Sequence, residues 1–156
     1  MNTLQKKRGD GSLKVVNIEG IPDAALLHKI LILHENIFKD SNTLISKAKY
    51  KPKLLFTVGL EKGNVVGYKI GYELDSNSFY SWLGGVNKND RNKGIASKLM
   101  TQQHLYLKAK GYNIVQTKTK NKWRNMLILN IKNGFDVIGT YTDNSGEPKI
   151  ILEKRL

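Results

Sequence analysis

The stretch FYSWLGGVNKNDRNKGIASKLM, residues 79–100, limits how the rest of the chain can fold. Its aromatic and β-branched beginning predicts a strand, and apolar residues three and four apart after Gly94 predict a one-sided helix that starts at this glycine. Two glycines inside the strand, Gly84 and Gly85, indicate a β-bulge or a close approach of another backbone. The stretch therefore predicts a strand, a polar loop and a helix, in that order.

The polar loop, residues 91–96, has the features of an anion site. A helix N-terminus leaves backbone N–H groups unpaired and carries the positive end of the helix dipole, so it can bind an anion, most naturally a phosphate. Arg91 and Lys93 add positive charge. Gly94 has no Cβ to hold a phosphate away from the backbone, and Ala96 is small. The same pattern also occurs as an ordinary surface turn, because basic glycine-containing turns before helices are common.

The loop and a second segment together resemble a known family. Arg91-Asn92-Lys93-Gly94-Ile95-Ala96 is similar to the acyl-CoA-binding loop of the GNAT superfamily of N-acetyltransferases, in which Gln or Arg is followed by two residues, Gly, one residue, and Gly or Ala. Residues 121–135 resemble the second family segment, a helix that ends in Lys-x-Gly-Phe. The resemblance covers about residues 54–156. It implies an α/β (α+β) fold with a mixed, mostly antiparallel sheet of about six to seven strands, a splayed parallel central pair and about four flanking helices.

The residues themselves predict compatible elements. Pro22 stands in the first turn of a helix. The strand at 112–120 follows a strand and a helix, so it should run parallel to the strand at 79–86. The predicted strands are 13–18, 54–61, 65–74, 79–86, 112–120, 135–142 and 147–155, and the predicted helices are 22–38, 42–49, 95–110 and 122–132.

The resemblance implies acetyl-CoA as co-substrate and a set of residues around it. Backbone amides near Val86 would hold the pantetheine arm and the loop would hold the pyrophosphate. Either Asn121 or Asn125 would bond the cofactor arm, and the sequence leaves this choice open. The implied cofactor-binding residues are Gly85, Val86, Arg91, Asn92, Lys93, Gly94, Ile95, Ala96, Ser97, Asn121 and Asn125.

The acceptor side is predicted from fewer signals. The resemblance implies that Glu35 and Phe38, on the first helix, contact the substrate, although a solvated glutamate and a core phenylalanine are the ordinary interpretations. Tyr80 and Trp82 are candidates to line a pocket that suits an apolar or cationic substrate.

The general base and the general acid depart from the family pattern. An alkyl ammonium titrates near about 10 and must lose its proton before it can attack. Many family members place a glutamate on the central strand, where this chain has Tyr80, Ser81 and Trp82. The alternatives are Glu73 on the neighbouring strand and Glu35, with His104 a weaker candidate because its helix position is expected to point away.

The family's tyrosine on the second-segment helix corresponds here to Asn130. Asparagine cannot donate a titrating proton, so Asn130 would hold a water or the thioester, and Tyr141 is the alternative acid. Asn130 also interrupts an apolar stripe and needs hydrogen bonds if it is buried. The stripe consists of Trp123, Met126, Leu127, Asn130 and Ile131, which fall at i, i+3, i+4, i+7 and i+8.

Composition restricts the class of protein. A chain of 156 residues with 40% hydrophobic and 25% charged residues is expected to form one globular domain, 1–156, with residues 1–11 flexible. No apolar run approaches the roughly 18 residues of a membrane span, which predicts a cytoplasmic protein without a membrane partner. The chain has no cysteine, and the spacing of its three histidines is not that of metal ligands, so no metal is expected.

Two functional hypotheses follow. The first is an N-acetyltransferase that moves an acetyl group from acetyl-CoA to a primary amine of a small molecule or peptide by direct attack in a ternary complex. The absence of cysteine favours direct transfer over an acyl-cysteine intermediate. A net charge of +13 makes an acidic substrate, or a peptide next to RNA, as plausible as a free polyamine. The alternative is a catalytically weakened CoA-binding or RNA-associated basic module, although no nucleic-acid module accompanies the charge. The terminal strands also suggest a homodimer.

Overall fold

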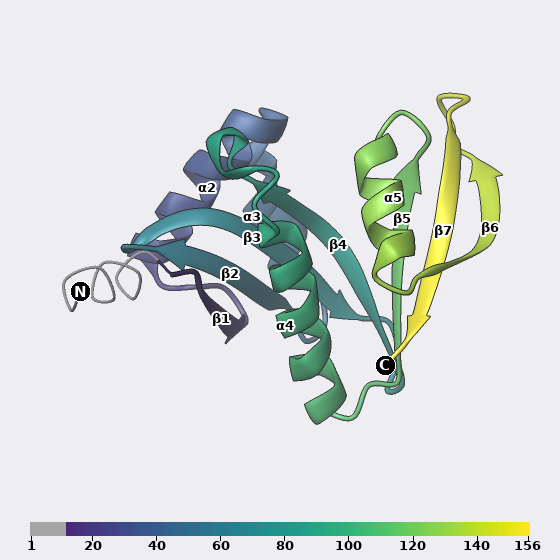
Figure 1. Ribbon diagram of the computed structural model, residues 1–156, viewed down its shortest axis with the longest axis horizontal. Helices are drawn as coiled ribbons and strands as arrows, with labels where there is room; N and C mark the ends of the chain where they lie inside the picture. The colour runs from purple at the N-terminus through teal and green to yellow at the C-terminus, as the bar shows by residue number, and fades with distance from the viewer. Residues whose placement is uncertain (1–11) are drawn as a thin grey trace, which may run out of the picture.

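The computed structural model describes residues 12–156, so the prediction for residues 1–11 lies outside the described part of the chain. A seven-stranded sheet in the order β1-β2-β3-β4-β5-β7-β6 forms the centre of the fold (Figure 1). Every neighbouring pair is antiparallel except β4 and β5, which are parallel. The elements are β1 (Lys14–Glu19), α2 (Ala24–Phe38), α3 (Ser41–Ala48), β2 (Leu55–Glu61), β3 (Asn64–Glu73), β4 (Ser78–Val86), the 3₁₀ turn η1 (Lys88–Asp90), α4 (Ile95–Ala109), β5 (Ile114–Lys120), α5 (Arg124–Lys132), β6 (Asp136–Thr142) and β7 (Pro148–Arg155).

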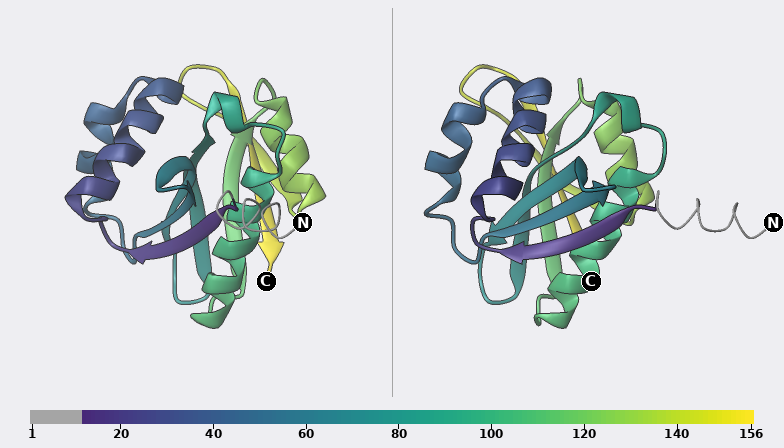
Figure 2. Two further views of the ribbon diagram at one scale, coloured as in Figure 1. Left: turned by 60° about the vertical axis from the view of Figure 1, so that its left-hand side comes forward. Right: turned by 90° about the vertical axis from the view of Figure 1, so that its left-hand side faces the viewer.

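The helices cover the sheet on both faces. Helices α2 and α3 lie on one face, and α4 and α5 lie on the other (Figure 2). The core under α2 and α3 is built around Phe56, Tyr68 and Ile70, and the core under α4 and α5 around Phe79 and Leu152. The predicted mixed sheet with a central parallel pair and four helices is therefore confirmed.

The first helix begins later than the sequence pattern predicts. Asp23 is its N-cap, and the carboxylate of Asp23 accepts a hydrogen bond of 2.9 Å from the Leu26 amide. Pro22 therefore precedes the cap and is buried outside the helix, so its predicted place in the first turn is wrong. A side-chain acceptor at the cap satisfies an otherwise unpaired amide, which a proline cannot do.

The irregularity in β4 does not lie at its paired glycines. The register against β3 shifts between Ile70 and Gly71, which leaves Trp82 as the extra residue on β4. Gly84 and Gly85 stay in register. The second prediction for them, a close approach, is confirmed at Gly85, because a Cβ built there would lie 2.6 Å from Cδ1 of Ile37 on α2.

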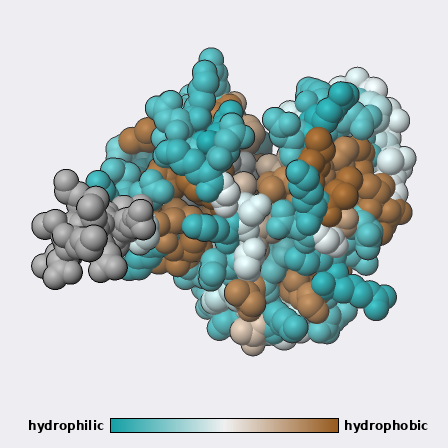
Figure 3. Space-filling model, viewed as in Figure 1, coloured by the Kyte–Doolittle hydropathy of each residue, from teal (hydrophilic) through white to brown (hydrophobic). Residues whose placement is uncertain are grey.

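Helix α5 turns only part of its apolar stripe to the sheet. Trp123, Met126 and Ile131 are exposed, whereas Leu127 and Leu129 pack against the core and Asn130 is buried. Periodicity identifies residues that share a helix face, but the neighbouring elements decide which face is covered. Because α5 lies at the end of the molecule, one side of this helix remains in solvent, and Figure 3 shows the hydrophobic surface there.

Candidate active site

The two parallel strands separate after only a few residues. Hydrogen-bonded pairing of β4 with β5 runs from Ser78↔Ile114 to Ser81↔Thr117. Beyond this point β4 pairs only with β3, and β5 pairs only with β7. Figure 1 shows the two strands diverging. We call the resulting gap, between residues 82–86 and 118–120, the fork.

The fork suits an extended ligand that contains amide groups. Backbone N–H and C=O groups on its two inner edges have no strand partner in the described part of the chain, and such groups pair readily with an inserted peptide-like segment. The hydroxyl of Thr117 donates a hydrogen bond of 2.9 Å to the Ser81 carbonyl and fixes the closed end of the fork.

Helix α4 starts beside the open end of the fork with free amides. Gly94 is its N-cap, with φ of 77°, and no side chain caps the helix. The first intrahelical hydrogen bond runs from the Lys98 amide to the Gly94 carbonyl at 3.1 Å. The amides of Ile95, Ala96 and Ser97 therefore have no acceptor within the helix, and they form a site for an anion.

Each of the two basic residues of the loop interacts with a nearby residue. Nε of Arg91 donates to the Val86 carbonyl at 3.2 Å, which connects the loop to the last residue of β4. Nζ of Lys93 lies 3.3 Å from the Asp90 carboxylate. Asn92 has a φ of 63°, so the loop turns through two left-handed residues to present its amides in one direction.

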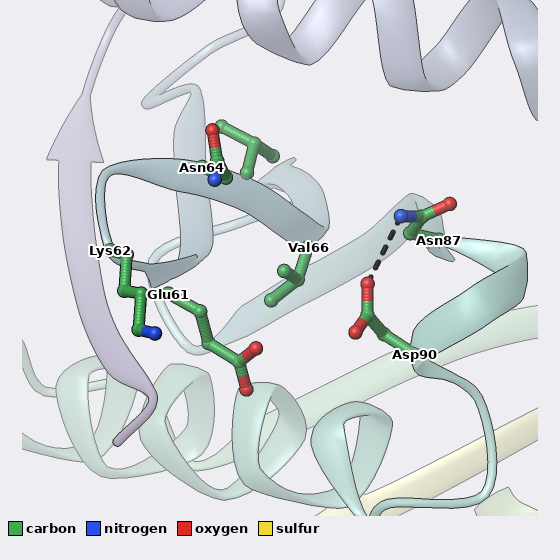
Figure 4. Close-up of a pocket in the computed structure, with 7 residues that line it drawn as sticks. Glu61, Lys62, Asn64, Val66, Asn87 and Asp90 are labelled. Carbon is green, nitrogen blue, oxygen red and sulfur yellow. Dashed lines mark hydrogen bonds between the residues drawn. The ribbon is translucent and has the colours of Figure 1, made fainter. Parts of the chain in front are cut away.

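A cavity of about 460 Å³ lies on another side of the same loop, next to the β2–β3 turn (Figure 4). The amide of Asn87 donates to the Asp90 carboxylate at 3.0 Å inside it. The carboxylates of Glu61 and Asp90 would repel a phosphate, so this cavity does not extend the anion site. Its lining residues are Glu61, Lys62, Asn64, Val65, Val66, Asn87 and Asp90.

The asparagines near α5 occupy different places. Asn121 and Asn125 are exposed at the open end of β5, where the fork is widest. Asn130 is buried on the helix. Asn133, which sequence reasoning missed, donates to the Leu129 carbonyl at 2.8 Å and lies 3.5 Å from the Ser97 hydroxyl. It connects the end of α5 to the first turn of α4, and only the sheet order brings these segments together.

The candidate acceptor residues gather on the α2 face. The ring of Phe38 lies close to Gly85, 3.7 Å from the place of a built Cβ. The carboxylate of Glu35 accepts hydrogen bonds from the amide and hydroxyl of Ser41, and these bonds lower the pKa of Glu35. A lowered pKa makes Glu35 a weaker base.

The remaining candidates, Glu73, Tyr141 and Asn130, lie in different parts of the molecule. Glu73 lies opposite Phe79, near the closed end of the fork, and its carboxylate accepts a hydrogen bond from Tyr112. Tyr141 is half-exposed on the edge strand β6, opposite Lys149 and turned away from α5, whereas Asn130 lies on α5. The structure therefore does not bring Glu73, Asn130 and Tyr141 into one cluster.

His104 faces inward, contrary to its predicted direction. It is buried under α4, its ring packs 5.6 Å from that of Phe135, and Lys154 Nζ donates to its Nδ1 at 3.1 Å. Burial lowers the pKa of His104 to about 3, and the charges of Lys154 and Lys69 act in the same direction. The imidazole is therefore neutral near pH 7.

This buried imidazole predicts a loss of stability in acid. Between pH 6.5 and pH 3 the unfolded chain protonates His104 and the folded chain does not, so stability falls as pH falls. From pH 7 to pH 5 the loss from this group is about 2 kcal/mol. We expect His104→Gln to flatten the urea-unfolding stability profile over this range, with His28→Gln, an exposed histidine, as control. Equal slopes in both variants would contradict the assignment.

Sequence reasoning gave no role to His34, a buried residue that the structure places at the centre of a partly buried hydrogen-bonded chain. One ring nitrogen pairs with the hydroxyl of Tyr68, and the other lies 2.5 Å from the Asp40 carboxylate. Tyr68 stands opposite Gly85 in the register of β3 and β4. The chain ties α2 and the start of α3 to the strand beside the fork.

Among residues 12–156 no group of three or more His, Cys, Asp or Glu side chains is arranged to hold a metal ion. No helix in the same range is long and apolar enough to cross a membrane.

Solved structures that share this fold include GNAT acetyltransferases. Ard1 from Thermoplasma volcanium has a TM-score of 0.76 and 14% identity, over 91% of this chain and 97% of that one. A GCN5-related N-acetyltransferase from Kribbella flavida gives 0.75 and 16%, over 92% and 98%. A GNAT family acetyltransferase from Elizabethkingia anophelis, with acetyl-CoA bound, gives 0.67 and 18%, over 91% and 98%. The sequence matches no family model and no curated protein. The fold is therefore the GNAT fold, as the resemblance implied.

Proposed function

We propose that this chain is an acetyl-CoA-dependent N-acetyltransferase that acts on a primary amine. The observation that carries the proposal is the adjacency of the fork to the uncapped N-terminus of α4. The fork offers backbone groups to the two amides of a pantetheine arm, and the helix offers free amides and two basic residues to a pyrophosphate. The GNAT family acetyltransferase from Elizabethkingia anophelis, which shares the fold, was solved with acetyl-CoA bound.

Each proposed cofactor residue has a physical role. Val86 offers its backbone groups to the pantetheine arm, whereas Gly85, whose own amide pairs with Tyr68 of β3, leaves room beside the arm because it has no side chain. Arg91, Asn92 and Lys93 shape the loop and supply its positive charge. Gly94 has no side chain that would block the approach of the pyrophosphate to the backbone amides at the start of α4. The amides of Ile95, Ala96 and Ser97 bind the pyrophosphate, and Asn121 or Asn125 bonds the arm from the α5 side.

The reaction we propose is a direct transfer. The nitrogen of the neutral amine bonds to the carbonyl carbon of the thioester, the C–S bond breaks, and the thiolate of CoA leaves. The nitrogen loses one proton and the thiolate gains one, so protons balance. No acyl-cysteine forms, because the chain has no cysteine.

The test of the proposal is calorimetric titration of acetyl-CoA into the wild-type protein, followed by assay of thiol release with a broad amine panel. We expect micromolar binding and amine-dependent release of CoA. Absence of acetyl-CoA binding would contradict the proposed function. Binding without release for any amine or peptide would favour the alternative, a CoA-binding module that has lost catalysis.

The net charge of +13 keeps an RNA-associated module as a second candidate. RNA binding that is tight and falls steeply with salt would support it, whereas binding only at low salt would reflect nonspecific charge.

A homodimer stays a proposal that rests on β6, an edge strand exposed along most of its length. The cytoplasmic location and the single-domain organisation expected from the sequence also stay predictions.

A further inference from the structure

A small cavity of about 120 Å³ opens at the closed end of the fork, on the sheet face opposite α5. It is lined by Tyr80 and Gln116, the next-to-last pair of β4 and β5 before the fork, together with Lys118. Because α4 and its anion site lie on the other face, a cofactor that enters there leaves this face free for the second substrate. The other lining residues are Tyr72, Leu74, Thr117 and Ile151.

Aromatic rings and a lysine lie at and beside this cavity. Tyr72 packs edge-on against Tyr80 and Trp82, at centroid distances of 5.4 and 5.9 Å. Nζ of Lys118 lies 5.9 Å from the ring centroid of Tyr80 and 5.2 Å from that of Tyr141. Four rings from β3, β4 and β6 thus form one surface.

A second lysine lies over the same surface. Nζ of Lys51 is 4.7 Å from the ring centroid of Tyr72 and 5.5 Å from that of Trp82. Within residues 12–156, neither Lys51 nor Lys118 forms an ion pair with a carboxylate. By contrast, Lys120, two residues along β5, pairs with Glu147 at 2.7 Å. The two lysines over the rings therefore keep their charge available for a ligand.

One carboxylate on this face of the sheet is already hydrogen-bonded. Glu153 lies opposite Gln116 in the β5–β7 register and accepts a hydrogen bond of 2.9 Å from its side-chain amide. A cationic ligand would meet two ammonium groups and compete with them for the ring faces. An anionic ligand would instead pair with the ammonium groups and leave the rings to pack against its apolar part.

We propose that the acceptor is a small amine that also carries a carboxylate, which Lys118 and Lys51 bind while the apolar part packs on Tyr80 and its neighbouring rings. This inference rests on the proposed function.

The first arm of the test compares acceptors that differ only in the second group. 4-Aminobutyrate carries a carboxylate, 1-aminobutane has the same chain without it, and 1,4-diaminobutane replaces it with a cation. We expect kcat/KM to be at least about tenfold higher for 4-aminobutyrate than for either amine, the effect of one charge-assisted hydrogen bond. L-Phenylalanine against phenethylamine repeats the comparison with an aromatic body.

The second arm tests Lys118 itself. We expect Lys118→Met to raise KM for 4-aminobutyrate by roughly 10- to 100-fold with kcat changed less than about twofold. Lys118→Arg should restore most of the binding, and Lys118→Glu should reverse the preference toward 1,4-diaminobutane. Lys108→Met, which removes an exposed lysine of α4, is the matched control. Lys118 is exposed, so thermal unfolding should confirm that these variants fold.

The outcomes separate this inference from the proposed function. If acetyl-CoA does not bind, both are wrong. If acetyl-CoA binds but 1-aminobutane or 1,4-diaminobutane reacts as well as 4-aminobutyrate, only the carboxylate specificity is wrong. The carboxylate specificity alone is also wrong if acetyl-CoA binds but no amino acid reacts or raises the melting temperature in the presence of CoA. It is likewise wrong if only peptides are acetylated.

Discussion

The Gly94→Glu variant is expected to bind acetyl-CoA at least about 100-fold more weakly than the wild type. Its carboxylate would compete for the amides of Ile95, Ala96 and Ser97 and would repel the pyrophosphate. Nothing lies within 4 Å of a Cβ built at Gly94, so the added side chain meets no core atoms. The loss should therefore appear in calorimetric affinity more than in folding.

Gly111→Glu is the matched control for this experiment. Gly111 follows the other end of the same helix, has a φ of 97°, and has open space around a built Cβ. Both variants carry the strain of an L residue with positive φ, but only one stands at the proposed pyrophosphate site. Equal acetyl-CoA affinities for Gly94→Glu and Gly111→Glu would show that α4 does not bind the cofactor.

The Phe79→Ala variant is expected to unfold about 3–5 kcal/mol more easily than the wild type, the usual cost of emptying a phenylalanine site in a core. Phe79 is 1% exposed where β4 and β5 still pair. Its ring packs edge-on against Tyr112 and fits against Gly71, where a Cβ would lie 2.5 Å from the ring. The surrounding strands cannot easily close over the cavity, because this residue joins the two halves of the sheet.

Urea unfolding provides the measurement, and Phe38→Ala provides the control. Phe38 is 40% exposed at the end of α2, so its removal should cost under about 1 kcal/mol. A Phe79→Ala protein no less stable than Phe38→Ala would mean that the packing at the closed end of the fork contributes little.

Local signals in the sequence were sufficient for the strand–loop–helix unit. Gly94 was predicted to start α4, and it does so with a left-handed φ. The parallel pairing of β4 with β5 was also predictable, because a strand that follows a strand and a helix returns in the same direction. These features depend on residues adjacent in the chain.

Contacts between distant segments were the part that local patterns missed. The inward direction of His104 was not foreseen, and the stripe on α5 did not show which of its residues would stay exposed, because periodicity does not say which helix face meets the sheet. The pairing of His34 with Tyr68 joins positions 34 residues apart.

The sequence by itself determined that the chain contains a basic glycine loop before a helix, a central strand interrupted by glycines and the elements of a mixed sheet. Only the tertiary structure decided that Lys118 would stand over Tyr80 and Tyr141, and that Lys51 would reach Tyr72 and Trp82. The physical reason is the sheet order. It places β3, β4, β5, β7 and β6 side by side and so makes one surface from residues that no spacing along the chain connects.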